Sequence, residues 1–344
     1  MDTPQIIEGV TQKRRSWINA LKGFWKAFFS SGAIEMAVLS YVILTSFLIL
    51  IFYNRIPSAK FMLIIRGEVV FGTLALFLLY FRTRSRIAWI LRVAFQITLL
   101  SYWYGETYEF NCLFPNLDHL FASIEEMCFF TQPALFFHEM MPQWWFSEIL
   151  HFAYFIYFAL FVGTMVYYYA VDYSSADRVV FIILASFFLY YVIYIFVPVA
   201  GPQFYYPAIG IDDVIAGVFP SLGDYFAHHK DLMPGPGYPQ GIFYRLVSMT
   251  QAVGERPTAA FPSSHVGITT IVLILVSKAK GGKLIFPFLL VVYVCLCLAT
   301  VYIQAHYLID VFAGIASGCF FWWLTNYLYT FFFSDNRLHK YKIT

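Results

Sequence analysis

The chain has 344 residues, of which 60% are hydrophobic and only 12% are charged. A soluble globular domain has about 25% charged residues, so this composition argues against a soluble protein and indicates a chain that has lipid as its solvent. The net charge of +2 says little by itself, but the distribution of the charges along the chain is informative.

Long apolar runs predict membrane-spanning helices, because a helix needs about 20 mostly apolar residues to cross the hydrocarbon core. Eight runs fit this description: 34–54, 62–82, 87–104, 147–171, 179–199, 264–278, 284–303 and 309–332. Arg66, Glu68 and Arg92 interrupt the second and third runs, so six or seven spans with one segment in the interface are an alternative. The fold class that we predict is all-α, a polytopic transmembrane helical bundle of about eight spans.

The segment before the first span, residues 1–33, lacks the apolar core and cleavage site of a signal peptide. Apolar residues recur in it at helical spacing, with Lys22 and Lys26 elsewhere on the helical wheel: Trp17, Ile18, Leu21, Phe24, Trp25 and Phe28. This pattern predicts an amphipathic helix on the anionic inner leaflet, and the alternative is a helix packed on the bundle. The spans of residues 34–86 would follow it.

The basic residues gather on one side of the predicted bundle. Fifteen of the 22 lysines and arginines lie in the N-terminal segment, the C-terminal segment and the connections at 83–86, 172–178 and 279–283, counting the span edges. Lysine and arginine in short loops stay cytoplasmic. We therefore expect both termini, including the tail at 333–344, to be cytoplasmic. The loops at 105–146, 200–263 and 304–308 would face the periplasm, the exterior or a lumen.

The five cysteines show no metal-binding pattern. Cys295, Cys297 and Cys319 lie in predicted spans, where cysteine behaves as a small core residue. Cys112 and Cys128 both fall in the outer loop at 105–146 and would be able to pair if that face is oxidising. Two cysteines in one loop are weak evidence for a disulfide, so the pairing stays open.

Two histidines stand at the mouths of apolar runs. His265, in FPSSHVGITT, begins the sixth predicted span after Ser263 and Ser264, and a serine before a helix is a favoured cap. His306 and Asp310, in HYLID, are four residues apart and would share one face of a helix. The carboxylate is then able to orient the imidazole and leave its other nitrogen free as a nucleophile.

Topology brings the two histidine motifs together, because the sixth span leaves the outer face and the seventh returns to it. His265 and His306 would lie at the same depth, beside a helix N-terminus that favours phosphate. This arrangement suits phosphoryl transfer, with one histidine attacking phosphorus and the other protonating the leaving oxygen. Two alternatives are that the histidines only anchor their helices at the interface, or that they bind zinc with His228, His229 and Asp231.

These motifs resemble signatures of the type 2 phosphatidic acid phosphatase superfamily of membrane lipid phosphatases and phosphotransferases. PSSH at 262–265 corresponds to the signature P-S-G-H, and residues 299–310 correspond to S-R-x5-H-x3-D. The resemblance implies a catalytic core of six spans at 87–332, with the first two spans as an addition. It implies that His306 forms a phosphohistidine, that Asp310 orients it, and that His265 is the general acid. No metal or other cofactor is implied.

The sequence departs from the family at its phosphate-binding positions. Ala299 and Thr300 replace the Ser-Arg pair, and VPVAGPQFYYP at 197–207 stands where the family's first signature belongs. A phosphate still needs cations or donors. Arg256 is our first choice, and the other candidates are Ser263, Ser264, Gln203, Tyr302, Arg245, Tyr205 and Tyr206.

The departures are most similar to the inositol phosphorylceramide synthase branch of the family, as is the acidic-aromatic segment PNLDHLF at 115–121. That resemblance implies transfer of a phospho-headgroup from a glycerolipid donor to a lipid hydroxyl, in sphingolipid metabolism. One alternative is hydrolysis of phosphatidate or an isoprenyl phosphate, with water as acceptor. Another is a non-catalytic membrane protein that binds or transports lipids. The expected partners are lipid substrates and the membrane, and no nucleic acid.

Overall fold

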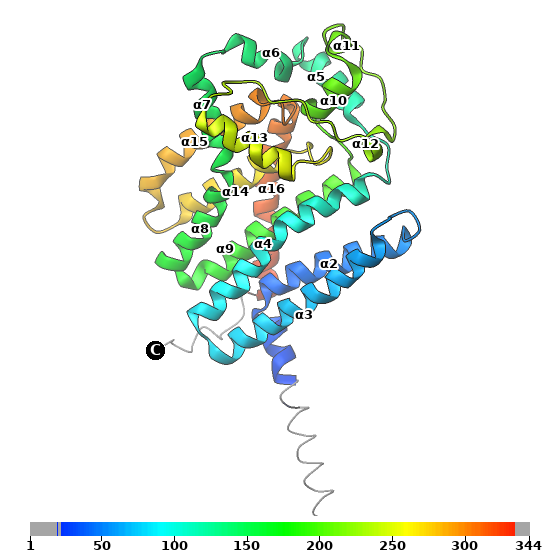
Figure 1. Cartoon of the computed structure of the whole chain (residues 1–344). Coiled ribbons are helices and arrows are strands. Elements are labelled where there is room, and N and C mark those ends of the chain that lie inside the picture. The colour runs from blue at the N-terminus through cyan, green and yellow to red at the C-terminus, as the bar shows by residue number, and fades with distance from the viewer. Residues whose placement is uncertain (1–18, 20–21, 334–344) are drawn as a thin grey trace, which may run out of the picture.

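The computed structural model describes residues 19 and 22–333 of the chain. In this part all regular structure is helical (Figure 1). The long helices are α2 (Ala33–Ile51), α3 (Ala59–Thr83), α4 (Arg86–Asn111), α9 (Tyr173–Phe196), α15 (Gly282–Tyr302) and α16 (Leu308–Phe333). Each is long and apolar enough to cross a membrane.

Two further predicted spans have less regular geometry. The run at 147–171 forms α7 (Trp144–Phe155) and α8 (Tyr157–Val171), which pass together as one span bent by 46°. The run at 264–278 forms α14 (Ser264–Lys278), an apolar helix of only 15 residues. The predicted polytopic helical bundle is confirmed, and each of the eight apolar runs coincides with one helix or one bent pair.

Short helices cover one end of the bundle (Figure 1). They are α5 (Asp118–Phe129), α6 (Pro133–Met140), α10 (Pro202–Ile209), α11 (Ile211–Ile215), α12 (Tyr225–His228) and α13 (Ile242–Gly254). We call these six helices and their connections the cap. They come from the two long loops that were predicted to lie on one side of the membrane, and the structure gathers both loops at the same end.

Buried ion pairs account for the two arginines that interrupt the second and third runs, whereas Glu68 is exposed. Arg66 on α3 donates to both carboxylate oxygens of Glu106 on α4, at 2.6 Å each. Arg92 on α4 binds Glu35 on α2 through two nitrogens, and Asp177 at the start of α9 lies 3.4 Å from the same guanidinium. A charge in the bilayer requires a partner, so these pairs tie the two N-terminal spans to the rest of the bundle.

The predicted amphipathic segment is described only in part. Trp17, Ile18 and Leu21 lie outside the described residues, whereas residues 22–31 are helical. Phe24 and Phe28 pack against Phe77 on α3, with ring centroids 5.7 Å and 5.1 Å apart. This part of the segment therefore contacts the bundle. The predicted tail at 333–344 lies outside the described residues beyond position 333.

Glycines let α14 and α16 approach closely. A Cβ atom on Gly314 would stand 2.7 Å from the Ser263 carbonyl oxygen, and one on Gly318 would stand 2.6 Å from that of Gly267. Gly314 and Gly318 form a small-xxx-small pair, which permits backbone contact between membrane helices. The contact joins the two predicted histidine motifs, because the Ser263 N–H donates to the Asp310 carbonyl oxygen at 3.2 Å.

Candidate active site

His306 lies in the turn between α15 and α16 and is buried. Its backbone N–H donates to the Thr300 carbonyl oxygen at 3.0 Å, and its side-chain Nδ1 lies 2.7 Å from the Ala260 carbonyl oxygen. A carbonyl oxygen only accepts, so Nδ1 carries the proton and Nε2 keeps a free lone pair. Nε2 is the nitrogen that is available for nucleophilic attack.

The environment keeps the His306 imidazole neutral. Burial lowers the pKa of His306 to about 4, although the bond to Ala260 and the nearby Glu255 carboxylate act in the opposite direction. An imidazole needs its lone pair to attack phosphorus, so the neutral form is the reactive one. His306 is therefore neutral at neutral pH, the form that a nucleophilic role would require.

His265 lies in the first turn of α14, opposite His306. The two imidazole centroids are 5.7 Å apart with the rings at 68°. Tyr154 and Tyr157, on either side of the break between α7 and α8, pack on the His265 ring at 4.6 Å and 4.5 Å. These contacts fix the ring, while its Nδ1 is buried without a hydrogen-bond partner. The convergence of the two histidines is the geometry that the topology predicted.

Asp310 lies beside His306, but its hydrogen bond goes elsewhere. The carboxylate Oδ2 is 3.6 Å from His306 Nδ1 and accepts the Tyr307 backbone N–H at 2.9 Å. The Ala260 carbonyl is the hydrogen-bond partner of the imidazole in this structure. Asp310 thus shapes the turn that carries His306, and its Oδ1 is buried without a partner.

The two serines of the PSSH string have different environments. Ser263 is fully buried, and its hydroxyl caps α14 by accepting the Val266 N–H at 3.5 Å. Ser264 is half-buried, and its backbone N–H donates to the Tyr194 hydroxyl at 3.1 Å. The predicted cap is present, and the two backbone N–H groups of Ser263 and Ser264 are already bonded to Asp310 and Tyr194.

The other predicted phosphate ligands divide into near and distant groups. Gln203 reaches the site, because its amide nitrogen donates to Glu255 at 3.3 Å and its backbone N–H to the Gln304 carbonyl at 2.9 Å. Arg256 follows Glu255 in the chain and donates to that residue's carbonyl oxygen. Tyr302 points away, with its hydroxyl on the Met141 carbonyl at 3.3 Å.

The same contacts show where the remaining candidates lie. Arg245 is on α13, where its Nε donates to the Pro239 carbonyl. The hydroxyl of Tyr205 donates to the Pro220 carbonyl, and that of Tyr206 donates to Gln132. All three are therefore engaged within the cap, and none of these bonds involves either histidine.

Glu255 is a site residue that the sequence analysis missed. It lies in the loop between α13 and PSSH, and burial raises the pKa of its carboxyl, against the effects of His306 and Gln203. The sequence offers one signal: an acid next to Arg256, ten residues before His265. Because loop conformation decides which of the two side chains faces the site, that signal alone did not identify Glu255.

Asp118 is a second missed residue, and it organises the loops around His306. Its buried carboxylate accepts the backbone N–H groups of Ala200 and Gly201, at 2.6 Å and 2.8 Å, and the hydroxyl of Tyr307 at 3.0 Å. The Asn116 amide adds a fourth bond at 2.6 Å. Asp118 belongs to the PNLDHLF segment and fixes Tyr307, the neighbour of His306.

Gly201 shows how tightly this loop approaches the turn that carries His306. Its φ is +92°, which favours glycine, and a Cβ atom would stand 2.8 Å from the Ala305 carbonyl oxygen. Ala260 closes the arrangement by donating its N–H to the Val199 carbonyl at 3.0 Å. The loop at 199–203 therefore supports the turn at 304–307 directly.

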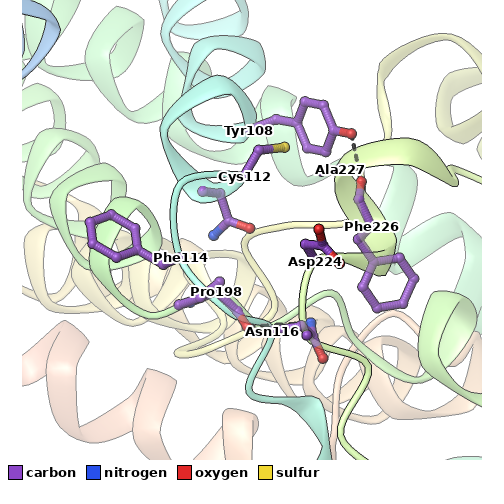
Figure 2. Close-up of a pocket in the computed structure, with 10 residues that line it drawn as sticks. Tyr108, Cys112, Phe114, Asn116, Pro198, Asp224, Phe226 and Ala227 are labelled. Carbon is purple, nitrogen blue, oxygen red and sulfur yellow. Dashed lines mark hydrogen bonds between the residues drawn. The ribbon is translucent and has the colours of Figure 1, made fainter. Parts of the chain in front are cut away.

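A small cavity beside the end of α4 is separate from the histidines (Figure 2). Its volume is about 10 Å³, which is room for roughly one water molecule. Tyr108 lines it and donates to the Phe226 carbonyl at 2.6 Å. Cys112 lines this cavity and is a free thiol, as is the exposed Cys128, so the pairing left open by the sequence is not formed. No cluster of three or more metal-ligating side chains occurs among the described residues.

Comparison with known families identifies the chain. A family model described as the PAP2 superfamily matches residues 119–324, which is more than half of the chain and includes both histidine motifs. The chain belongs to the PAP2 superfamily. Comparisons with curated proteins and with solved structures gave no match. The PAP2 superfamily consists of lipid phosphatases and phosphotransferases, so the chain is an enzyme of this type, integral to the membrane with multiple passes.

Proposed function

We propose that this PAP2 enzyme transfers a phospho-headgroup between lipids through a phosphohistidine on His306. The observation that carries the proposal is the opposition of the two imidazoles, 5.7 Å apart, with the His306 lone pair free. Nε2 of His306 attacks phosphorus, and His265 gives a proton to the departing lipid oxygen. The acceptor hydroxyl then loses its proton to His265 and attacks the same phosphorus, so the phospho-headgroup passes to the acceptor and the bond to His306 breaks.

The phosphate charge needs compensation in a site that lacks the family's arginine. Thr300 stands at the arginine's place and is fully buried within α15. We propose that Arg256 takes over this role, because it lies in the loop that carries Glu255 to His306. The raised pKa of Glu255 favours its neutral carboxyl form, which would not repel a phosphate and would be able to donate a hydrogen bond.

The proposed donor is a phosphorylated glycerolipid, and the proposed acceptor is a lipid hydroxyl, as in inositol phosphorylceramide synthases. Purified protein should be incubated with a labelled donor, with and without a ceramide or diacylglycerol acceptor. Labelled acceptor lipid supports transfer. Release of free phosphate or free headgroup phosphate, unchanged by acceptor, would instead indicate the second candidate, a lipid phosphate phosphatase. Two single variants, His306→Ala and His265→Ala, should each abolish turnover.

The orientation of the site is part of the same proposal. The excess of lysine and arginine at the end opposite the cap supports cytoplasmic termini and a cap outside or in a lumen. A reporter fused after Thr344 should behave as cytoplasmic. A membrane-impermeant probe should label a cysteine at position 230 from outside. The reverse labelling pattern would place the histidines on the cytoplasmic face and refute the orientation.

A further inference from the structure

The helix α13 has two faces of different character. Val247 and Gln251 are buried, and Gln251 donates to the Gln203 side chain at 3.1 Å. Three apolar side chains are largely exposed: Ile242 at 70%, Met249 at 67% and Val253 at 79%. At about 100° per residue these three lie within roughly 40° of one another on the wheel. They form one apolar stripe opposite the buried face.

The depth of α13 follows from its contacts with the bent span. Phe243, at its start, packs on Phe152 and Phe155 with centroids 4.9 Å and 6.3 Å apart. Both partners lie at the C-terminal end of α7, next to the break before α8. Upstream, Tyr238 lies 6.3 Å from Trp144 at the start of α7. The chain therefore descends along α7 from Trp144 to the break before α13 begins.

Helix lengths place that break inside the hydrocarbon layer. Both α8 and α14 have 15 residues. Each rises about 22 Å, whereas the hydrocarbon core is about 30 Å thick. If the lysines at 278–283 mark the opposite boundary of the hydrocarbon core, a rise of about 22 Å brings the break and His265 to roughly 8 Å below the cap-side boundary. The 12 residues of α7 cover the remainder and bring Trp144 and Trp145 to the interface, where such residues gather.

Arg245 fits this placement. It is the one basic residue of α13, and its Nε donates to the Pro239 carbonyl at 3.2 Å, next to Tyr238. The guanidinium thus turns back toward the level of Trp144. Long basic side chains near a bilayer boundary extend to the interface in this way.

We propose that α13 lies within the cap-side leaflet, with Ile242, Met249 and Val253 against lipid acyl chains. Phe158 on α8, three residues beyond the Phe155 that packs on Phe243, is 58% exposed as well. The opposite face of α13 leads into Glu255 and the histidine pair. The helix therefore separates the acyl chains from the histidine pair. If the proposed function holds, a lipid substrate enters the site past α13.

Spin-label accessibility tests the placement. Met249→Cys is labelled with a nitroxide in a variant whose five native cysteines are serine, in phospholipid nanodiscs. Phe288→Cys on α15 is the lipid-facing control, because Phe288 is 63% exposed on a span, and Asp231→Cys in an exposed cap loop is the aqueous control. We expect high oxygen access and low access to a nickel chelate at 249, close to the values at 288.

Two results would overturn the proposal. Nickel access at 249 equal to that at 231 would place the stripe in water. Exclusion of both reagents, with dipolar broadening, would mean that a second copy covers it. If the serine variant does not fold, the native chain is photolabelled with phospholipids that carry a diazirine in the acyl chain. Adducts within 242–254 are then expected, and their absence counts against the placement. Neither spin-label accessibility nor photolabelling requires enzyme activity, so the placement of α13 is tested separately from the proposed function.

Discussion

Asp118 offers the sharpest test of how the cap positions His306. In Asp118→Ala, four donors lose their acceptor: the N–H groups of Ala200 and Gly201, the Tyr307 hydroxyl and the Asn116 amide. A buried donor without a partner costs about 1–3 kcal/mol. Water entering the vacated space satisfies some of them, and the cost of burying a carboxylate disappears. We therefore expect a net loss of about 3–6 kcal/mol in the free energy of unfolding.

Tyr307→Phe is the milder member of the series. It removes one hydrogen bond to a charged acceptor and leaves the other three in place, so the expected loss is about 1.5–3 kcal/mol. The free energies are measured by denaturing titration in detergent micelles, with the exposed Asp212→Ala as control, for which we expect a change within about 0.5 kcal/mol. Because Tyr307 adjoins His306, kcat should fall more than KM rises in both variants. An Asp118→Ala protein within about 1 kcal/mol of wild type would refute the reasoning.

Three further predictions concern the helix contact and pH. Gly314→Val forces a side chain against the Ser263 carbonyl, so we expect a loss of about 1–3 kcal/mol in the free energy of unfolding and of most of the activity. The control Ala316→Val changes an exposed residue and should affect neither. Equal activity of the two variants would contradict the contact. Burial raises the pKa of Glu125 to about 8. The folded protein therefore loses stability as pH rises from about 4.5 to 8, by up to about 1.4 kcal/mol per pH unit. Glu125→Gln should remove this loss when unfolding is measured as a function of pH. For His306, whose pKa is about 4 when folded, the sign reverses: stability falls as pH drops from about 6.5 to 4, and the difference between wild type and His306→Asn should show that slope.

The fold and the histidine pair were predictable because their signals are periodic or local. Apolar runs report spans directly, since the bilayer fixes their length. PSSH and HYLID each carry their chemistry within a few residues, and alternation of the spans brings them together. The bend between α7 and α8 was not predictable, because the run at 147–171 contains no proline and the residues at the bend, 155–157, are all hydrophobic.

The residues that support His306 were hidden for a different reason. The Ala260 carbonyl that binds Nδ1 is a backbone atom, and no side-chain pattern reports which carbonyl faces an imidazole. Asp118 acts across 189 positions of sequence on Tyr307, through a loop whose conformation depends on Gly201. Such contacts are settled by the packing of two long cap loops. The i,i+4 spacing of His306 and Asp310 indicated proximity, and the structure shows the carboxylate on a backbone N–H instead.

The acidic residues around the histidines have a common physical logic. Asp118 and Asp310 are buried, yet both accept backbone N–H groups from the loops that surround His306. Burial of a carboxylate is costly unless donors surround it, so each acid holds its loop in one conformation. The donors are thereby used for structure rather than for phosphate. The loop at 255–256 lies next to His306 and follows directly on α13. Its side chains bond locally, because the Gln203 amide donates to Glu255 and Arg256 donates to the Glu255 carbonyl oxygen. One continuous segment of chain therefore joins α13, which we propose lies against acyl chains, to the loop that we propose binds the phosphate.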